Sequence, residues 1–179
     1  MNDIILPQSF PAGAMAVICA PHAAADHISP LIVRLALGGT VRVLDGGNRL
    51  QAYPLTRLIR LHTPAVEEVS QRIHVRRAFT AYQMLALLEE ISPSSVPCIL
   101  LDLLASFYDE TLPLNEAHSL LKRCLERSDA LRVLAPVIVT LAPPPTPRRY
   151  SLFEAVCQRA DALWLEPQPS APPVQFSLF

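Results

Sequence analysis

The sequence predicts an α/β protein with a mostly parallel central sheet flanked by helices. Short apolar segments alternate with segments of helical periodicity along most of the 179 residues. Hydrophobic residues make up 51% of the chain, enough to cover both faces of a buried sheet. Because a helical crossover returns each strand in the same direction, this alternation favours parallel strands.

Apolar runs mark the expected strands. Residues Met15 to Cys19 and the segment PVIVTL at 136–141 are apolar almost without interruption, which is typical of strands buried on both faces. The segment PCILLD at 97–102 has the same character and ends in an acidic residue. The predicted strands span 14–20, 40–44, 72–76, 97–102, 136–141 and 162–165.

Helical spacing and terminal signals mark the expected helices. Apolar residues from Ile28 to Leu35 recur at helical spacing before a Gly-Gly pair, and Pro30 is expected near the first turn. Thr80, followed three residues later by Gln83, predicts a capping box. The predicted helices span 23–37, 54–62, 64–71, 80–91, 114–128 and 151–160.

The chain divides into one domain and three short flanking segments. Residues 1–13 are expected to be an irregular lead-in, 14–166 the α/β domain, 167–174 a proline-rich linker, and 175–179 a terminal peptide. There is no signal-peptide pattern and no apolar run long enough to span a membrane. The four cysteines are dispersed without C-x-x-C spacing, so we expect reduced thiols in a cytoplasmic protein without a membrane partner.

The strand and helix around residue 20 form the frame in which a phosphate-binding loop would lie. Such a loop needs glycines for close backbone approach, a lysine for the phosphates and a hydroxyl for Mg²⁺. In the register G-x-x-x-x-G-K-[ST], the chain has Ala20, Ala25, Asp26 and His27. Both glycines are therefore replaced, an acid takes the place of lysine, and histidine takes the place of the hydroxyl. We expect the frame of a nucleotide site without its chemistry.

Over residues 10–166 the order of segments resembles the core of the RecA-type recombinase ATPases. The segment VLDGGN is similar to the second strand of that family, and CILLDLLASFYDE is similar to its Walker B strand and following loop. The segment RIHVRRAFTAYQMLALLEEI is similar to the strand and helix that precede Walker B. The resemblance rests on residues 14–37, 43–48, 72–91 and 98–110.

The resemblance implies that Gly47 stands where the family has the glutamate that positions the attacking water. Asp102 keeps the Walker B position, although an ordinary acid ending a buried strand is the alternative interpretation. An acid at position 26 would repel nucleotide phosphates, since lost lysine attraction and added repulsion act together. We therefore predict a pseudo-ATPase with no catalytic residue and no cofactor. The alternative is a nucleotide-binding or DNA-dependent ATPase of the same superfamily with an atypical loop.

The sequence also contains residues that bear on a metal site and on a DNA contact. His22 and His27 flank Asp26, but their spacing of five residues is poor for shared ligation on a helix, so we expect no metal site. The formal net charge of −1 provides no overall attraction to nucleic acid, so a DNA contact must be local. Arg148 and Arg149 follow a proline run and offer such a contact, with solvated surface charge as the alternative.

The terminal peptide closely resembles the clamp-binding motif of bacterial sliding-clamp partners, whose usual form is Gln-Leu-Ser/Asp-Leu-Phe. Two adjacent apolar side chains would fill a hydrophobic pocket and the glutamine would bind at its rim. A tail folded back on the domain is the alternative. The residues of the motif are Gln175, Phe176, Ser177, Leu178 and Phe179.

Together these features predict a non-catalytic RecA-like accessory protein of bacterial DNA repair, with the sliding clamp as its partner. Within that class the chain is similar to the ImuA-type proteins, which work with an error-prone polymerase in the SOS response and translesion synthesis. An error-prone DNA polymerase or an intact RecA-type protein is a further expected partner, and DNA contact is expected to be weak or indirect. A structural subunit of a RecA-type partner that never binds a clamp is the remaining alternative.

Overall fold

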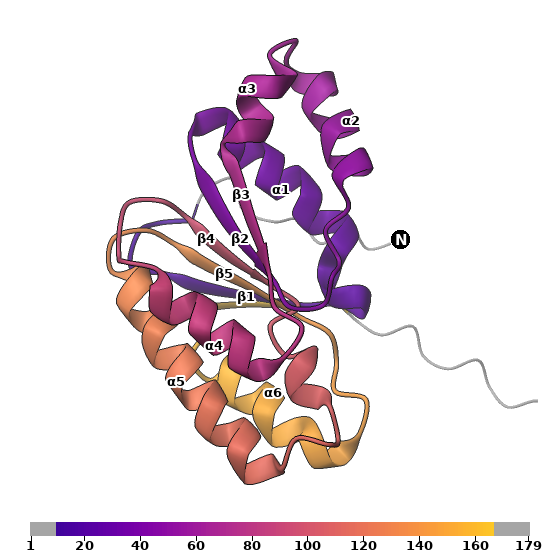
Figure 1. Cartoon of the computed structure of the whole chain (residues 1–179), viewed down its shortest axis with the longest axis vertical. Coiled ribbons are helices and arrows are strands. Elements are labelled where there is room, and N and C mark those ends of the chain that lie inside the picture. The colour runs from indigo at the N-terminus through magenta and orange to yellow at the C-terminus, as the bar shows by residue number, and fades with distance from the viewer. Residues whose placement is uncertain (1–9, 167–179) are drawn as a thin grey trace, which may run out of the picture.

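The computed structural model describes residues 10–166 and confirms the predicted α/β class (Figure 1). All strand pairs are parallel, and the six-stranded sheet has the order β3-β2-β4-β5-β1-β6. The sheet is therefore fully parallel rather than mostly parallel. Its strands are β1 (Met15–Cys19), β2 (Val41–Asp45), β3 (Ile73–Arg77), β4 (Cys98–Leu101), β5 (Val137–Leu141) and β6 (Ala162–Leu165).

Six α-helices connect or follow these strands within the described part of the chain. They are α1 (Ala25–Gly38), α2 (Ala52–His62), α3 (Val66–Gln71), α4 (Ala81–Glu90), α5 (Leu114–Arg132) and α6 (Tyr150–Cys157). Three short 3₁₀ turns lie between them: η1 (Pro21–Ala24), η2 (Ser106–Tyr108) and η3 (Pro147–Arg149).

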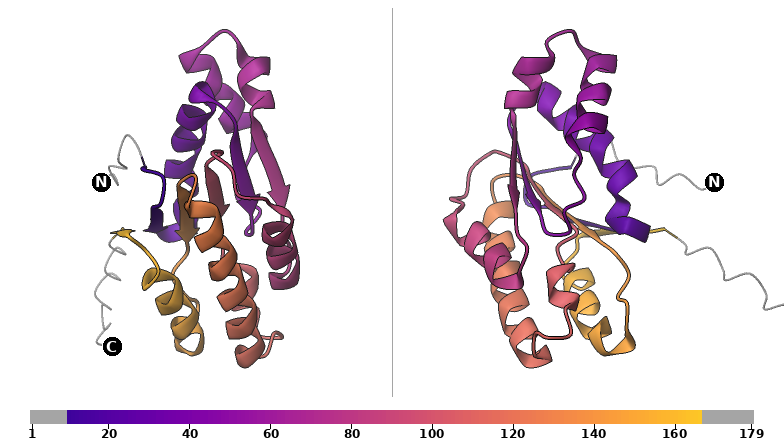
Figure 2. Two further views of the ribbon diagram at one scale, coloured as in Figure 1. Left: turned by 90° about the vertical axis from the view of Figure 1, so that its left-hand side faces the viewer. Right: turned by 45° about the vertical axis from the view of Figure 1, so that its right-hand side comes forward.

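The helices are divided between the two faces of the sheet, as Figures 1 and 2 show. Helices α1, α2 and α3 cover one face, where Ile18, Val43 and Ile99 point from neighbouring strands into one apolar cluster. Helices α4, α5 and α6 cover the other, where Val17 and Leu100 point into a second cluster. Alternate residues of the central strands thus enter opposite layers, which explains why β1 and β4 are apolar throughout and β5 is apolar except for Thr140.

The first helix differs from the prediction in its start and in the place of its proline. Residues 22–24 have left-handed backbone angles, so α1 begins at Ala25 instead of residue 23. Pro30 is consequently the sixth residue of α1 and lies beyond the first turn. Its missing N–H leaves the carbonyl of residue 26 without the usual helical donor.

Other boundaries shift by a few residues. Helix α5 continues four residues past its predicted end, with Leu131 buried in its last turn, whereas α6 stops at Cys157 instead of residue 160. The capping box at α4 is confirmed: the Gln83 amide donates to Thr80 Oγ1 at 3.1 Å. The Gln83 side chain accepts from the amide of Phe79 at 2.8 Å, one residue before the cap.

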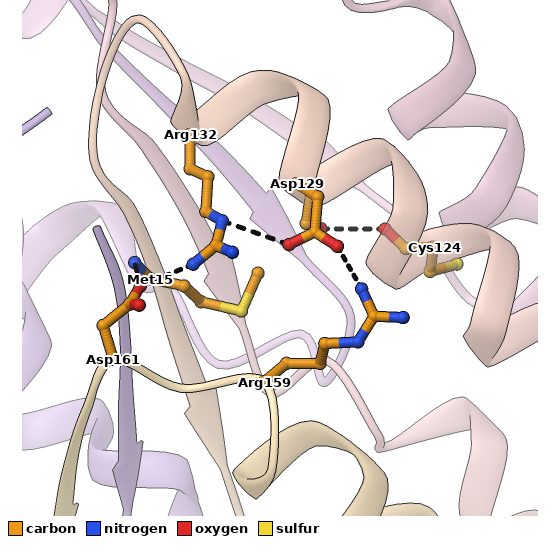
Figure 3. Close-up of polar contacts among 7 residues, drawn as sticks. Met15, Cys124, Asp129, Arg132, Arg159 and Asp161 are labelled. Atoms are coloured by element: carbon orange, nitrogen blue, oxygen red, sulfur yellow. Dashed lines mark hydrogen bonds and ion pairs between the residues drawn. The ribbon is translucent and has the colours of Figure 1, made fainter. Parts of the chain in front are cut away.

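Ion pairs hold the N-terminal end of the sheet to the end of α5 (Figure 3). Asp129 pairs with both Arg132 and Arg159, and Arg132 Nη1 lies 2.5 Å from Asp161 Oδ2. The amide of Met15, at the start of β1, donates to the same carboxylate at 2.7 Å. The hydrogen bond from this amide is the main cause that holds the pKa of Asp161 below its usual range. The positive charge of Arg132 lowers that pKa further.

The four cysteines are free thiols, three of them buried. Burial raises the pKa of Cys98 and Cys124 to about 12 and that of Cys19 to about 11. These thiols are therefore protonated near neutral pH and belong to the core. Within residues 10–166, every helix is too short or too polar to cross a lipid bilayer.

Candidate functional site

The topology places the candidate site at the carboxyl ends of the strands. In a parallel sheet these ends meet at one edge, and ligands bind where neighbouring connections leave toward opposite faces. The chain leaves β1 toward α1 on one face, whereas it leaves the adjacent β5 toward α6 on the other. The same divergence occurs between β2 and β4. The predicted site residues from Ala20 to Asp102 lie at these two divergences.

The turn after β1 has the backbone of a glycine loop but not its residues. His22, Ala23 and Ala24 have φ angles of 54°, 54° and 56°. Each such left-handed residue other than glycine costs about 1–2 kcal/mol. The Ala23 amide donates to the carbonyl of Ala20 at 3.0 Å, and the Ala25 amide donates to that of His22. These two amides bond within the turn and are not directed at a phosphate.

The positions after this turn do not carry the lysine and hydroxyl of a phosphate loop. Asp26 and His27 lie in the first turn of α1, so the lysine and hydroxyl positions of a phosphate loop remain without either group. His27 Nε2 lies 4.0 Å from Glu166 Oε2, which links α1 to the end of β6. Within residues 10–166, no three His, Cys, Asp or Glu side chains gather closely enough to hold a metal ion.

The second part of the site is a pair of buried carboxylates, and the first of them organises the loop after β2. Asp45 ends β2 and is completely buried. Its two oxygens accept from the amides of Arg49 and Leu50, each at 2.9 Å. Arg77 Nε lies 3.7 Å from Oδ2. Both Asp45 oxygens therefore accept hydrogen bonds from the loop after β2, and Oδ2 also lies near an arginine at the end of β3.

Asp102, the predicted Walker B acid, follows β4 and is only 1% exposed. Arg49 Nε donates to its Oδ2 at 2.8 Å, and its amide donates to Thr140 Oγ1 of β5 at 2.9 Å. Its φ of 51° turns the chain sharply at the end of the strand. Oδ1 is buried and has no partner among the described residues. The carboxylate therefore faces an arginine of the β2–α2 loop.

The closest approach in the site is between Gly47 and Asp102. A Cβ atom on Gly47 would lie 2.2 Å from Asp102 Oδ2 and 2.7 Å from its Cγ. A Cβ on Gly46 would lie 2.8 Å from the Asp102 carbonyl oxygen. Neither glycine has a left-handed φ, so space and not backbone conformation requires them. At the position expected for a catalytic glutamate, the carboxylate of Asp102 occupies the volume that a side chain would need.

The structure brings some predicted residues together and keeps others apart. Gly47 and Asp102 are in contact, but β5 separates β1 from β4. The turn beginning at Ala20 therefore lies two strand spacings, about 10 Å, from the end of β4. Arg49 bonds to both carboxylates, and Arg77 lies near Asp45 only. Neither was predicted from the sequence as part of this site, and the only signal for Arg49 was its place in a turn four residues after Asp45.

A groove of about 450 Å³ lies beside Arg49, between α1 and α2. Ser29 lines it from α1, and Tyr53 and Arg57 line it from α2. The Tyr53 ring is largely exposed, and no described carboxylate lies within ion-pair distance of Arg57. The groove thus combines hydroxyl donors with positive charge.

The two arginines proposed for DNA contact have different environments. Arg148 is exposed, whereas Arg149 is 4% exposed. Arg149 Nη2 donates to the carbonyls of Asp109 and Leu112 at 2.7 and 2.6 Å. Solvated surface charge is therefore the wrong interpretation of Arg149, and only Arg148 presents its guanidinium at the surface.

The linker at 167–174 and the terminal motif from Gln175 to Phe179 lie outside the described residues. The clamp-binding prediction therefore rests on the sequence. No protein-family model matches the chain. A search of curated proteins likewise gives no significant match.

Proposed function

We propose that this chain is a non-catalytic, RecA-like accessory protein that works by binding other proteins in bacterial DNA repair. The observation that carries the proposal is the contact between Gly47 and Asp102. It supports the absence of hydrolysis because the position expected for the water-positioning glutamate has no room even for a methyl group.

The environment of Asp102 further supports a non-catalytic role. A Walker B carboxylate serves Mg²⁺, which demands near-octahedral oxygen ligands and is held together with substrate phosphates. Here Oδ2 pairs with Arg49 at 2.8 Å. The positive charges of Arg49 beside Asp102 and of Arg77 beside Asp45 oppose the binding of a further cation there. The turn after β1 has no lysine to hold the phosphates that would accompany the ion.

The proposed partner is the bacterial sliding clamp, bound through Gln175–Phe179. The proline-rich segment 167–174 is suited to present this peptide in an extended form. Leu178 and Phe179 would supply the buried anchors, which carry most of the affinity of short peptides. An error-prone polymerase or a RecA-type protein is the proposed second partner, for which the folded domain would serve as the docking surface.

The enzymatic part of the proposal is tested by measuring nucleotide binding and hydrolysis with the full chain. We expect no magnesium-dependent ATP turnover, with or without single-stranded DNA. Turnover that is lost in Asp102→Ala would contradict the proposal and support an ATPase with an atypical loop.

The clamp part is tested separately by titrating the full chain against a purified bacterial sliding clamp. We expect binding that falls at least about tenfold in Leu178→Ala and in Phe179→Ala. Tyr53→Ala, which removes an exposed aromatic residue of the folded domain, is the matched control. Equal binding by all these variants would remove the clamp from the proposal and leave the question of hydrolysis unaffected.

The groove between α1 and α2 favours one alternative, a protein that binds a nucleotide without hydrolysing it. Its arginines, Arg49 and Arg57, would face the phosphates. ATP titration separates this alternative from the main proposal: saturable binding that is weakened in Arg57→Gln, without turnover, would establish it.

A further inference from the structure

A second pocket, of about 350 Å³, lies where α5 and α6 begin, and it is independent of the proposed docking function. Both helices start at the same end of the molecule (Figure 1). The pocket is lined by two segments of chain, 110–114 and 146–149, which contribute both apolar and polar groups. The lining residues include Glu110, Pro113, Leu114, Thr146, Arg148 and Arg149.

Arg149 is the central group of this pocket. The residue is 4% exposed, and its Nη2 donates to the carbonyls of Asp109 and Leu112. The Asp109 carboxylate instead accepts from the Thr111 amide at 2.9 Å and hydroxyl at 2.8 Å. Among residues 10–166, no carboxylate lies within ion-pair distance of Arg149. The Arg149 guanidinium lowers the pKa of the Asp109 carboxylate, after the larger effect of the Thr111 hydrogen bonds, but forms no direct ion pair with it.

Two buried polar atoms of the pocket have no hydrogen-bond partner among the described residues. They are Arg149 Nη1 and Thr146 Oγ1. A buried polar group left unsatisfied costs about 1–3 kcal/mol, more for a charged one. Because both atoms belong to residues that line one pocket, a single acceptor-rich ligand would satisfy both.

The start of α5 adds further donors. The first hydrogen bond of α5 runs from Ala117 to the carbonyl of Pro113, and Pro113 provides no side-chain cap. The amides of Leu114, Asn115 and Glu116 therefore have no acceptor within the helix. Amides at a helix start attract anions, and α5 is 19 residues long.

We propose that this pocket binds the phosphate group of a small phosphomonoester, held by Arg149, Thr146 and the first amides of α5. A phosphate offers acceptor oxygens in several directions, as donors from two separate segments require. The volume exceeds that of phosphate alone and leaves room for a small organic group. A nucleic-acid backbone lying on the surface would meet Arg148 but would not reach the buried Arg149.

The two unsatisfied atoms have almost no contact with solvent. The ligand therefore reaches them when a lining side chain turns aside. Arg148 is the side chain suited to this movement because it is exposed and forms no ion pair within the described part of the chain. Once turned, its guanidinium would cover the bound anion, which would offset the negative charge of Glu110 at the same pocket.

The test is a titration of the full chain with inorganic phosphate and with glycerol phosphate, followed by the amide signals of residues 114–116. We expect saturable shifts with both ligands and none with acetate at equal ionic strength. Thr146→Val keeps the side-chain shape and removes the hydroxyl, and should weaken binding about fivefold or more. Arg148→Gln should weaken binding and reduce its salt dependence.

Arg60→Gln, an exposed arginine of α2 without a described ion pair, is the matched control and should bind phosphate as the wild type does. Absence of a response at 114–116, or equal weakening by Thr146→Val and Arg60→Gln, would overturn the proposal. A single-stranded oligothymidylate that displaces phosphate and depends on Thr146 would also overturn it, because the site would then serve nucleic acid. Thr146→Val keeps the test valid even where Arg149 variants fail to fold.

Discussion

The contact between Gly47 and Asp102 gives the sharpest prediction for this protein. In Gly47→Ala the new methyl carbon would lie 2.2 Å from Asp102 Oδ2, far inside van der Waals contact. The carboxylate cannot stay in place, and moving it breaks the 2.8 Å bond to Arg49. Overpacking costs about 1–3 kcal/mol, and separating a buried charge from its partner adds to that cost. We expect Gly47→Ala to lower the free energy of unfolding by about 2–4 kcal/mol.

The assay is a double-mutant cycle measured by urea unfolding. Asp102→Ala removes the two atoms nearest the new methyl, Oδ2 at 2.2 Å and Cγ at 2.7 Å, and keeps only its own Cβ at 2.8 Å, so Gly47→Ala should cost less in that background than in the wild type. The coupling energy between the two sites should then be at least about 1.5 kcal/mol. Gly38→Ala is the matched control, because a Cβ there meets nothing within 4 Å. If Gly47→Ala destabilises the wild type and the Asp102→Ala background equally, the steric argument fails.

Three further predictions concern the core and the ends of the sheet. Phe107→Ala should lower the free energy of unfolding by about 3–5 kcal/mol because the ring is fully buried, whereas Phe79→Ala, whose ring is 68% exposed, should change it little in the same urea experiment. The hydrogen bond from the Met15 amide lowers the folded-state pKa of Asp161. The stability that Asp161 contributes is therefore present above its unfolded pKa of about 3.9, and it is lost as the pH falls through the folded-state pKa. Asp161→Asn should therefore destabilise the protein at pH 7, and a difference from wild type that fails to shrink under acid would contradict this. The Cys98 thiol, with a pKa of about 12, should resist a disulfide reagent at pH 8 until the protein is unfolded, and fast native-state labelling at Cys98 would refute its burial.

The predicted site and the observed site differ for a physical reason. The residues of the turn after β1 lie next to one another in sequence, so their departure from a phosphate loop could be recognised directly. Arg49 contacts Asp102 across 53 positions, and Arg149 contacts Asp109 across 40. Such distant contacts depend on strand order and loop paths, which local patterns do not encode. The buried state of Arg149 was missed because an arginine beside a proline run is typical of the surface.

The sequence by itself determined the α/β class, the alternation of strands and helices and the capping box at Thr80, because these depend on spacing among neighbouring residues. It did not determine the order β3-β2-β4-β5-β1-β6 or the fully parallel arrangement. Only the tertiary structure decided that Asp102 fills the space beside Gly47 and that Arg149 lies buried without a direct ion pair among the described residues. Those features arise where separate loops meet at the ends of the strands and helices, and packing between distant segments sets them.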